Sequence, residues 1–409
     1  MDKIKFMERF ADVIIKLGLN LQKGQILNIN SNVEAYEFVR IIAIKAYEYG
    51  AKDVVIKYND DHIIRALYEN VDVEDIKNIP DYVYHQARYL VDNNACMLSI
   101  SSPNPGIMKG LDINKMQAYN LAYMKKVPFL RDYSMNNKGQ WCVVSIPNLT
   151  WANKVFENDK DAYDKLFAAI MKASRIDLDN DCVSNWQNHM KRLEAHRDIL
   201  NNYNFKTLHF KNSLGTDLYV DLVENHIWGG GGEYTQNGIY FSPNIPTEEV
   251  FTMPSAYGVN GRVYSTKPLN YQGHLIENFY LDFKDGAVIN YHAEAEEEAL
   301  KALLETDEGS MRLGEVALIS YDSPISNMNV LFYNTLFDEN ASCHLALGNA
   351  YTMNIKDGYN LSVEELKKLG YNSSMIHVDF MFGSKDLSVI GITHDGKEVK
   401  VFNKGNFVF

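Results

Sequence analysis

The sequence predicts a mixed α/β protein of two domains, an N-terminal α/β domain and a strand-rich α+β C-terminal domain. The first observation is length, because 409 residues exceed the roughly 250–300 at which a single hydrophobic core stops growing. The second is that strand-like and helix-like segments alternate near the start of the chain. The third is that short β-prone runs dominate after Leu208. We place the boundary so that residues 1–195 form the first domain and 196–409 the second.

The N-terminal domain is expected to begin with a helix, because Phe6, Phe10 and Ile14 recur at helical spacing. The next elements are predicted as a strand over 26–30, a helix over 33–49 and a strand over 53–58. This order is typical of a parallel α/β unit. The polar, helix-prone stretch from about 153 to 203 is expected to be a helical bridge between the two domains.

The C-terminal domain is predicted from its short β-prone runs and two helical stretches. The strands are expected at 217–222, 278–283, 287–292, 315–320 and 387–392, and the helices near 293–305 and 361–369. The glycine run 229–232 lacks the strand-then-helix context of a dinucleotide fingerprint. We therefore interpret it as a flexible loop rather than a phosphate cradle.

Charge and composition exclude several classes of protein. A formal charge of −13 argues against a nucleic-acid partner, because such binding depends on cationic side chains. No apolar stretch reaches about 18 residues, so we expect no membrane contact and no secretion signal. The cysteines have no CxxC spacing, which favours reduced thiols and a cytoplasmic location. They are Cys96, Cys142, Cys182 and Cys343. The Asn-x-Ser/Thr matches at Asn148, Asn340 and Asn372 are interpreted as chance.

The first candidate for chemistry is His377-Val378-Asp379 within the β-prone run MIHVDFMF. On a strand, residues i and i+2 point to the same face, so the imidazole and the carboxylate would project side by side as metal ligands. The alternative is a chance pair on a half-exposed strand. The sequence has no GxxxxGK[ST], HExxH or GxSxG motif that would indicate another chemistry.

The second candidate is the segment DENASCHLALGNAY over 338–351. If it is helical, His344 and Tyr351 are seven residues apart and share a face, so an imidazole and a phenol would point into one cavity. The alternative for His344 is a core or capping residue. Glu339 would reach the same pocket or stabilise the N-terminus of the helix.

Two glutamates beside apolar runs complete the candidate set. Glu315 begins the run EVALIS, and Glu249 stands before Val250 in NIPTEEVFT. Carboxylates beside buried runs usually have a partner, and a metal ion is one possibility. The alternative for each is a solvated strand end. Together, the glutamates, histidines and aspartate form a ligand set expected of a two-metal hydrolase, which includes phosphoesterases and amidohydrolases as well as peptidases.

Longer blocks of the sequence are more specific. Nearly the whole chain resembles the thermophilic-type aminopeptidases, the M29 family of metallopeptidases. The blocks that carry this resemblance are NIPTEEVFT (244–252), GVNGRVYSTKPL (258–269), ETDEGSMRLGEVAL (305–318), SPISNMNVLFYNTLFDENASCHLALGNAY (323–351) and HVDFMFGSKDL (377–387).

The resemblance implies a metal-dependent aminopeptidase that releases N-terminal residues from short peptides with a free N-terminus. It implies two divalent ions, which zinc, cobalt, manganese or magnesium would satisfy, and a water nucleophile that they activate. It also implies a homodimer. The implied metal ligands are Glu249, Glu315, Glu339, His344, His377 and Asp379. The implied catalytic residues are Glu315 as a bridge between the metals and Tyr351 as a phenol that stabilises the oxyanion.

Two rival interpretations remain. A different two-metal hydrolase is disfavoured by the block matches and by the scarcity of arginine around the candidate ligands. A catalytically inactive peptide-binding protein would need a lost ligand, whereas every matched ligand position is filled.

Overall fold

The computed structural model describes residues 2–271 and 274–409, and they form two compact units. Unit 1 runs through His189 and also includes Gly232–Pro246, and unit 2 comprises Met190–Gly231 and Thr247–Phe409. The division falls within helix α10 (Cys182–Tyr203), the same helix that contains the boundary expected after residue 195. Within the described ranges, no helix combines the length and apolarity needed to cross a membrane.

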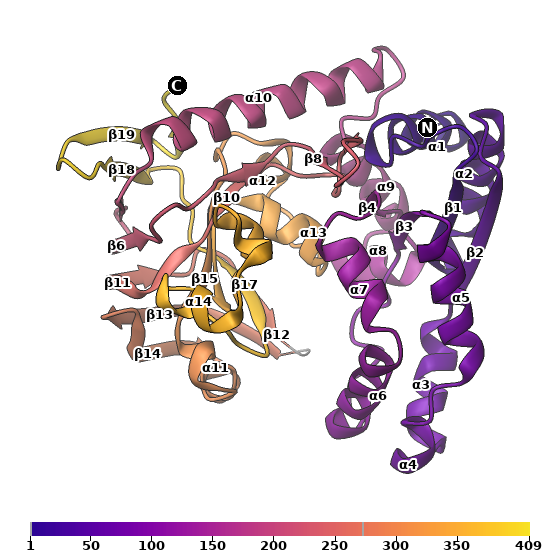
Figure 1. Ribbon diagram of the computed structural model, residues 1–409, viewed down its shortest axis with the longest axis horizontal. Helices are drawn as coiled ribbons and strands as arrows, with labels where there is room; N and C mark the ends of the chain where they lie inside the picture. Colours follow the sequence, from indigo (N-terminus) through magenta and orange to yellow (C-terminus); the bar gives the residue numbers. More distant parts are fainter. Residues whose placement is uncertain (1, 272–273) are drawn as a thin grey trace. The chain divides into compact units, whose positions relative to one another are not determined.

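Unit 1 is built on a parallel sheet of four strands in the order β2–β1–β3–β4 (Figure 1). Strand β1 (Ile26–Asn32) pairs in parallel with β2 (Asp53–Asn59), and helix α2 (Tyr36–Glu48) connects them. The predicted parallel α/β unit is therefore confirmed. Helix α1 (Lys3–Val13) buries the apolar face that its spacing predicted, and its Phe10 stacks on Phe38 of α2 with ring centroids 5.4 Å apart.

The other elements of unit 1 are mostly helices. Strand β3 (Cys96–Ser101) and β4 (Trp141–Ser145) complete the sheet. The helices are α3 (Asp61–Asn70), α4 (Val73–Ile76), α5 (Asp81–Asp92), α6 (Ile113–Lys126), α7 (Pro128–Met135), α8 (Leu149–Val155) and α9 (Ala162–Ala173). The short pair β8 (Glu233–Tyr234) and β9 (Tyr240–Phe241) belongs to the segment that returns to this unit.

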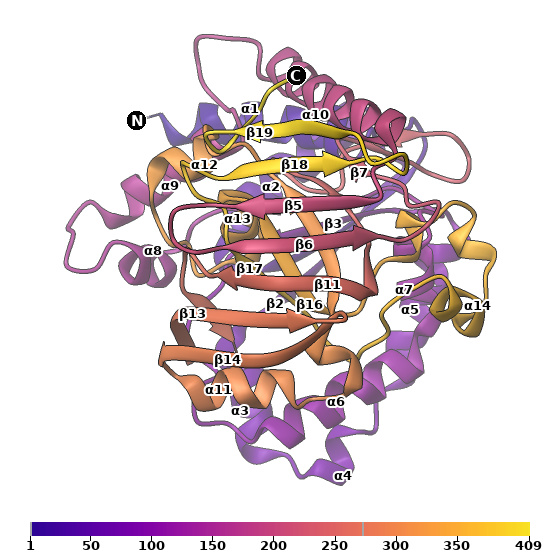
Figure 2. The same cartoon turned by 90° about the vertical axis from the view of Figure 1, so that its left-hand side faces the viewer.

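Unit 2 contains a large antiparallel sheet, which Figure 2 shows face on. Its strands follow the order β12–β13–β11–β6–β5–β18–β19–β20, and β14 pairs with β13. Their bounds are β5 (Thr207–Lys211), β6 (Asp217–Leu222), β11 (Pro254–Tyr264), β12 (Leu269–Tyr271), β13 (His274–Lys284), β14 (Ala287–Ala295), β18 (Ser388–Ile392), β19 (Glu398–Asn403) and β20 (Asn406–Phe407). The strands predicted at 217–222, 278–283, 287–292 and 387–392 are confirmed.

A second antiparallel sheet in unit 2 has the order β17–β16–β15–β10–β7. Its strands are β7 (Gly229–Gly230), β10 (Val250–Thr252), β15 (Leu313–Leu318), β16 (His344–Gly348) and β17 (His377–Met381). Strand β15 contacts β11 of the large sheet. Every residue of β15 and β16 is buried, which explains why their sequences are continuous apolar runs instead of alternating ones.

Short helices connect the strands of unit 2. They include α11 (Glu297–Leu304), α12 (Pro324–Met328), α13 (Thr335–Asp338) and α14 (Val363–Lys368). The helix predicted near 293–305 begins later than expected, because β14 continues to Ala295 and takes the first residues. The helix predicted near 361–369 is confirmed as α14.

The prediction of a flexible loop at the glycine run is wrong for its first half. Gly229 and Gly230 form β7 and pair with Phe251 and Val250 of β10. A Cβ atom on Gly230 would lie 2.7 Å from the carbonyl oxygen of Glu249, so only glycine permits this approach. The first half of the run therefore pairs with the strand that directly follows Glu249 and fixes the backbone there.

Candidate metal centre

One face of the five-stranded sheet carries four of the predicted ligands on three neighbouring strands. Glu315 of β15 lies opposite Ala346 of β16, and Ala346 lies opposite Asp379 of β17. His344 and His377 are each two residues from these positions along β16 and β17, so the pleat turns them to the same side. The strand expected for His377-x-Asp379 is confirmed.

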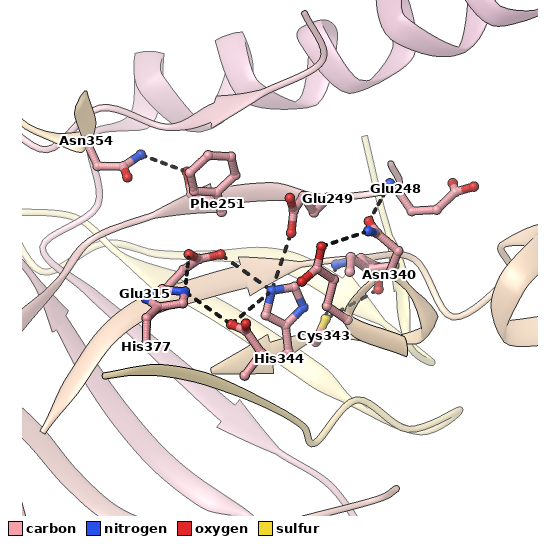
Figure 3. A network of polar contacts seen from close by, with 12 residues as sticks. Glu248, Glu249, Phe251, Glu315, Asn340, Cys343, His344, Asn354 and His377 are labelled. Atoms are coloured by element: carbon pink, nitrogen blue, oxygen red, sulfur yellow. Dashed lines mark hydrogen bonds and ion pairs between the residues drawn. The ribbon is translucent and has the colours of Figure 1, made fainter. Parts of the chain in front are cut away.

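Glu249 reaches this face from the other side of β15, because it directly precedes β10. Its Oε2 atom lies 3.3 Å from Nε2 of His344 (Figure 3). The donor atoms form two groups of three residues, and within each group they lie within 4.8 Å of one another. The first group is Glu249, Glu315 and His344, and the second is Glu315, His377 and Asp379.

Glu315 belongs to both groups, and its two oxygens face different histidines. Oε1 lies 3.4 Å from Nε2 of His344, and Oε2 lies 3.5 Å from Nε2 of His377. Its side chain is only 6% exposed, so the alternative of a solvated strand end is wrong for this residue. A carboxylate in this position can join two cation sites.

Backbone carbonyls orient both imidazoles. Nδ1 of His377 lies 2.7 Å from the carbonyl oxygen of Asn349, and Nδ1 of His344 lies 3.4 Å from that of Ser342. A proton on Nδ1 donates to the carbonyl in each case, which leaves Nε2 with a lone pair directed at the carboxylates. This tautomer is the one that binds a metal through Nε2.

Small residues leave room between the donor groups. Ala346 separates Glu315 from Asp379 across the strands, and Ala317 lies opposite His344. Gly348 lies opposite His377 at the end of β16. A larger side chain at Ala346 would project between the two carboxylates.

The charges of the cluster do not balance without added positive charge. Burial raises the pKa of Glu249, and burial together with the neighbouring carboxylates raises that of Glu339. Burial lowers the pKa of an imidazole, but the carboxylates outweigh it and raise the pKa of both His344 and His377. These four shifts favour proton uptake. Glu315 is the exception, because its two histidines outweigh burial and lower its pKa to about 2. The histidines therefore neutralise Glu315 and leave the excess negative charge on the carboxylates around it.

Asp379 provides a second indication that the donor set fits a metal ion. Its Oδ1 atom is buried and has no hydrogen-bond partner among the described residues. It lies 3.5 Å from Nε2 of His377 and 3.9 Å from Nε2 of His344. A buried carboxylate oxygen without a donor is costly, and a bound cation removes that cost. Mixed carboxylate and imidazole donors suit several divalent metals.

Glu339 lies beside this cluster but outside the two groups. It begins a short 3-10 helix (Glu339–Ala341) and lines a cavity together with Asp379. Asn340 holds it in place: Nδ2 is 3.5 Å from Oε1 of Glu339, while Oδ1 accepts the backbone N–H of Glu248 at 2.7 Å. Sequence reasoning missed Asn340, whose side chain is fully buried.

The segment from His344 to Tyr351 is not helical, so the condition under which these two residues would share a helix face is not met. His344 begins strand β16, and Tyr351 follows that strand at the start of a 3-10 turn (Thr352–Asn354). Pairing with strands on both sides overrides the local helical preference of the alanine-rich segment. The phenol still reaches the cluster, because the Tyr351 and His377 rings are 4.7 Å apart between centroids. Burial and then the carboxylates raise the pKa of Tyr351, so it stays protonated.

Comparison with known proteins identifies the class that this fold and cluster define. The family model described as thermophilic metalloprotease (M29) matches residues 4–407. The chain therefore belongs to the M29 family of metallopeptidases, and it is a peptide hydrolase. The family expected from the sequence blocks is confirmed.

Individual relatives cover nearly the full length. Aminopeptidase 2 of Geobacillus stearothermophilus is 44% identical over 407 residues, which are 99% of this chain and 98% of the relative. Aminopeptidase T of Thermus aquaticus is 37% identical over 98% of each chain. The structure of wild-type AmpT from Thermus thermophilus superimposes with a TM-score of 0.92 at 35% identity, covering 99% of this chain and 100% of that one. The predicted mixed α/β arrangement of two domains is confirmed by this match.

Proposed function

We propose that this protein is a two-cation aminopeptidase that releases N-terminal residues from short peptides. The single observation that carries the proposal is that Glu315 directs one oxygen to each of two histidines and so joins two donor groups. The relatives named as aminopeptidases support the choice of the N-terminal residue as the one removed.

The proposed ligands divide between two cation positions. Glu249 and His344 would hold one ion, His377 and Asp379 the other, and Glu315 would bind both. Glu339 would complete the set from its place beside Glu249 and Asp379. Zinc, cobalt, manganese and magnesium all accept such donors. When bound, divalent ions lower the pKa of water toward neutrality and polarise a peptide carbonyl.

The residues of the chain would perform three tasks. Glu315 would set the separation of the two cation positions, because its two oxygens face the two histidines. Tyr351, a protonated phenol beside His377, donates a hydrogen bond to the negative charge that develops on the carbonyl oxygen. The carboxylates attract the positively charged α-amine of a peptide, which favours cleavage of the first bond.

Further parts of the proposal concern the whole protein. We propose a cytoplasmic homodimer that acts on short peptides and has no membrane or nucleic-acid partner. The catalytic domain would be residues 196–409, with 1–195 as the N-terminal α/β domain and its helical bridge. The four cysteines are free and buried, which agrees with a reducing compartment.

The test is hydrolysis of a leucyl peptide and its N-acetylated twin by the purified full-length protein. We expect cleavage of only the free-amine peptide, its loss after chelation and its return with zinc, cobalt or manganese. Cleavage of the acetylated twin would contradict the aminopeptidase assignment, and cleavage that survives complete metal removal would contradict the cation centre.

A further inference from the structure

A small cavity opens beside the proposed cation centre within unit 2. Its volume is about 80 Å³, and Glu339 and Asp379 form part of its wall. The rest of the wall includes the apolar side chains of Leu269, Leu331 and Met381 and the rim residue Thr335. Pro268 is also apolar, whereas Asn270, Tyr333, Asn334 and Asp338 add polar groups. The cavity therefore joins two proposed ligands to a pocket of mixed polarity with an apolar side.

We propose that this cavity binds the side chain of the N-terminal residue of the substrate and selects small aliphatic residues, about the size of valine, over aromatic ones. This inference depends on the aminopeptidase function proposed above. It adds the class of substrate and the residues that set it.

The position of the cavity favours the first residue of the peptide. Met381 is on β17 two residues after Asp379, so it shares the face that carries His377 and Asp379. In an N-terminal residue, one carbon atom separates the α-amine from the scissile carbonyl, and the side chain leaves from that carbon. With the amine and carbonyl at the carboxylate cluster, the side chain enters the nearest space, which Met381 and Asp379 border.

The walls of the cavity are held by the fold. The backbone N–H of Thr266 donates to the carbonyl of Met381 at 2.9 Å, which ties the segment before Leu269 to β17. On the other side, the Asp338 carboxylate accepts the backbone N–H groups of Phe332 and Asn334 at 2.7 and 3.0 Å. These bonds fix the loop that contributes Leu331, so the cavity has a defined size.

The size of the cavity excludes rings. An apolar cavity of about 150 Å³ accommodates benzene, which is about 25 Å³ for each heavy atom. On that scale, a volume of about 80 Å³ accommodates roughly three heavy atoms, the number in a valine side chain. Phenylalanine and tyrosine would have to displace Met381, which is only 4% exposed.

The cavity wall carries one carboxylate outside the proposed cation centre. Asp338 is the carboxylate that lines the pocket away from the cation cluster, and both of its oxygens accept backbone N–H groups. It also interacts electrostatically with Lys267, whose ammonium is largely buried. Burial nevertheless outweighs these contacts and raises the pKa of Asp338 to about 6, so selection in the cavity depends on its size and not on this charge.

The first experiment compares peptides that differ only in their N-terminal residue, with alanine, valine, leucine, phenylalanine or arginine before a constant remainder. We expect kcat/KM for the valyl peptide to exceed that for the phenylalanyl peptide by at least about tenfold. Met381→Ala enlarges the cavity and should shift the ratio toward phenylalanine. Thr335→Leu narrows it from an exposed position and should reduce valine hydrolysis more than alanine hydrolysis. Met375→Ala, a methionine that is 79% exposed, is the matched control and should leave the ratio unchanged.

A second series varies only the second residue of the peptide. If Met381→Ala and Thr335→Leu change selectivity there and not at the first residue, the cavity binds the leaving side and the proposal is wrong. A profile that neither variant changes also overturns it.

Calorimetric binding of free L-valine and L-phenylalanine to the metal-loaded protein gives a readout without turnover. Valine should bind more tightly than phenylalanine, and Thr335→Leu should weaken valine binding. If no peptide is hydrolysed although valine binds in this way, the proposed function fails while the cavity is still a valine-sized site. If peptides are hydrolysed but Met381→Ala and Thr335→Leu change neither amino-acid binding nor the kcat/KM ratios, only the cavity proposal fails.

Discussion

The two sheets of unit 2 differ in how much positive charge lies beside their buried or partly buried carboxylates. On the large sheet, Asp282 of β13 accepts two hydrogen bonds from Arg262 of β11, at 2.5 and 2.7 Å, and a third from Asn290 of β14 at 2.9 Å. On the five-stranded sheet, the ion-pair partners of Glu249, Glu315 and Asp379 within the described residues are histidines that they share. The first carboxylate has its own cation, whereas the second group has too little positive charge.

The difference shows what separates a structural charge from a functional one. The hydrogen bonds from Arg262 hold the pKa of Asp282 below its usual range, because the ionised form is the satisfied one. Burial and the neighbouring carboxylates Glu315 and Asp379 raise the pKa of Glu249, because its ionised form lacks enough positive charge around it. A cluster of buried carboxylates therefore indicates a cation site when its histidines lower the pKa of one member, Glu315, but the pKa values of Glu249 and Glu339 stay raised.

The largest expected effect comes from Glu315→Gln, which keeps the shape of the side chain and removes its charge from both donor groups. The substitution should remove several kcal/mol of charge stabilisation from the transition state, which lowers kcat/KM by at least about 10³-fold. Metal content measured on the purified variant should also fall. Asp282→Asn is the matched control on the other sheet and should keep both activity and metal. Full metal content and activity in Glu315→Gln would remove the basis of the two-cation assignment.

The second prediction compares two histidines that both lie beside carboxylates. His377 faces Glu315 and Asp379, whereas His209 of β5 pairs with Asp217 at 2.7 Å on the large sheet. His377→Ala should lower zinc affinity and kcat/KM by about 10²–10³-fold, because a ligand to one ion is lost. His209→Ala should change neither by more than about twofold, as expected for a partly exposed pair.

Affinity is measured by competition with a chromogenic chelator, and the folded state is monitored by circular dichroism. Equal effects of the two substitutions on zinc affinity would mean that the five-stranded sheet holds a structural charge cluster like those of the large sheet.

Local patterns predicted the elements that depend on neighbours in the sequence. The pair His377 and Asp379 is on a strand because two-residue alternation is a local property of the backbone. The parallel unit at the start of the chain is similarly local, since β1, α2 and β2 follow one another directly. The shared face of Glu315 and Asp379 depends on pairing between distant strands, and only the resemblance to known peptidases suggested that these residues converge.

Long-range packing explains the failures. The segment after His344 has good helix formers, but pairing with β15 on one side and β17 on the other makes it a buried strand within a sheet. The close approach of Gly230 to Glu249 is likewise invisible in the local sequence. Asn340 was interpreted only as part of a chance glycosylation match, although its amide links the backbone before Glu249 to Glu339.

The third prediction concerns this asparagine as a positioning residue. Asn340→Ala removes the bonds to the Glu248 N–H and to Glu339 and should weaken zinc binding by about 10–100-fold. The matched control is Asn148→Ala in unit 1, where the side chain is also buried and donates to the Ser102 carbonyl at 2.8 Å. Both variants should lose stability, and only Asn340→Ala should lose zinc affinity. If the zinc affinities of both variants equal that of the parent, Asn340 contributes to the fold alone.

The smallest expected effect is on stability, and it comes from the ion pair between Asp282 and Arg262 on the large sheet. Asp282→Asn should lower stability at pH 7 by about 0.5–1 kcal/mol, a modest value because the Arg262 side chain is 39% exposed. Because the folded pKa of Asp282 lies below its unfolded value near 3.9, this contribution is present above about pH 4. It is lost as the pH falls through the folded pKa and Asp282 takes up a proton. Calorimetric melting of both proteins from pH 7 to pH 3, in the presence of chelator, should show the difference in melting temperature shrinking toward acid. A difference that stays constant over this range would mean that the contribution of Asp282 does not depend on its charge. No difference at any pH would mean that Arg262 stabilises the sheet by packing on Tyr280, whose ring centroid is 4.1 Å away.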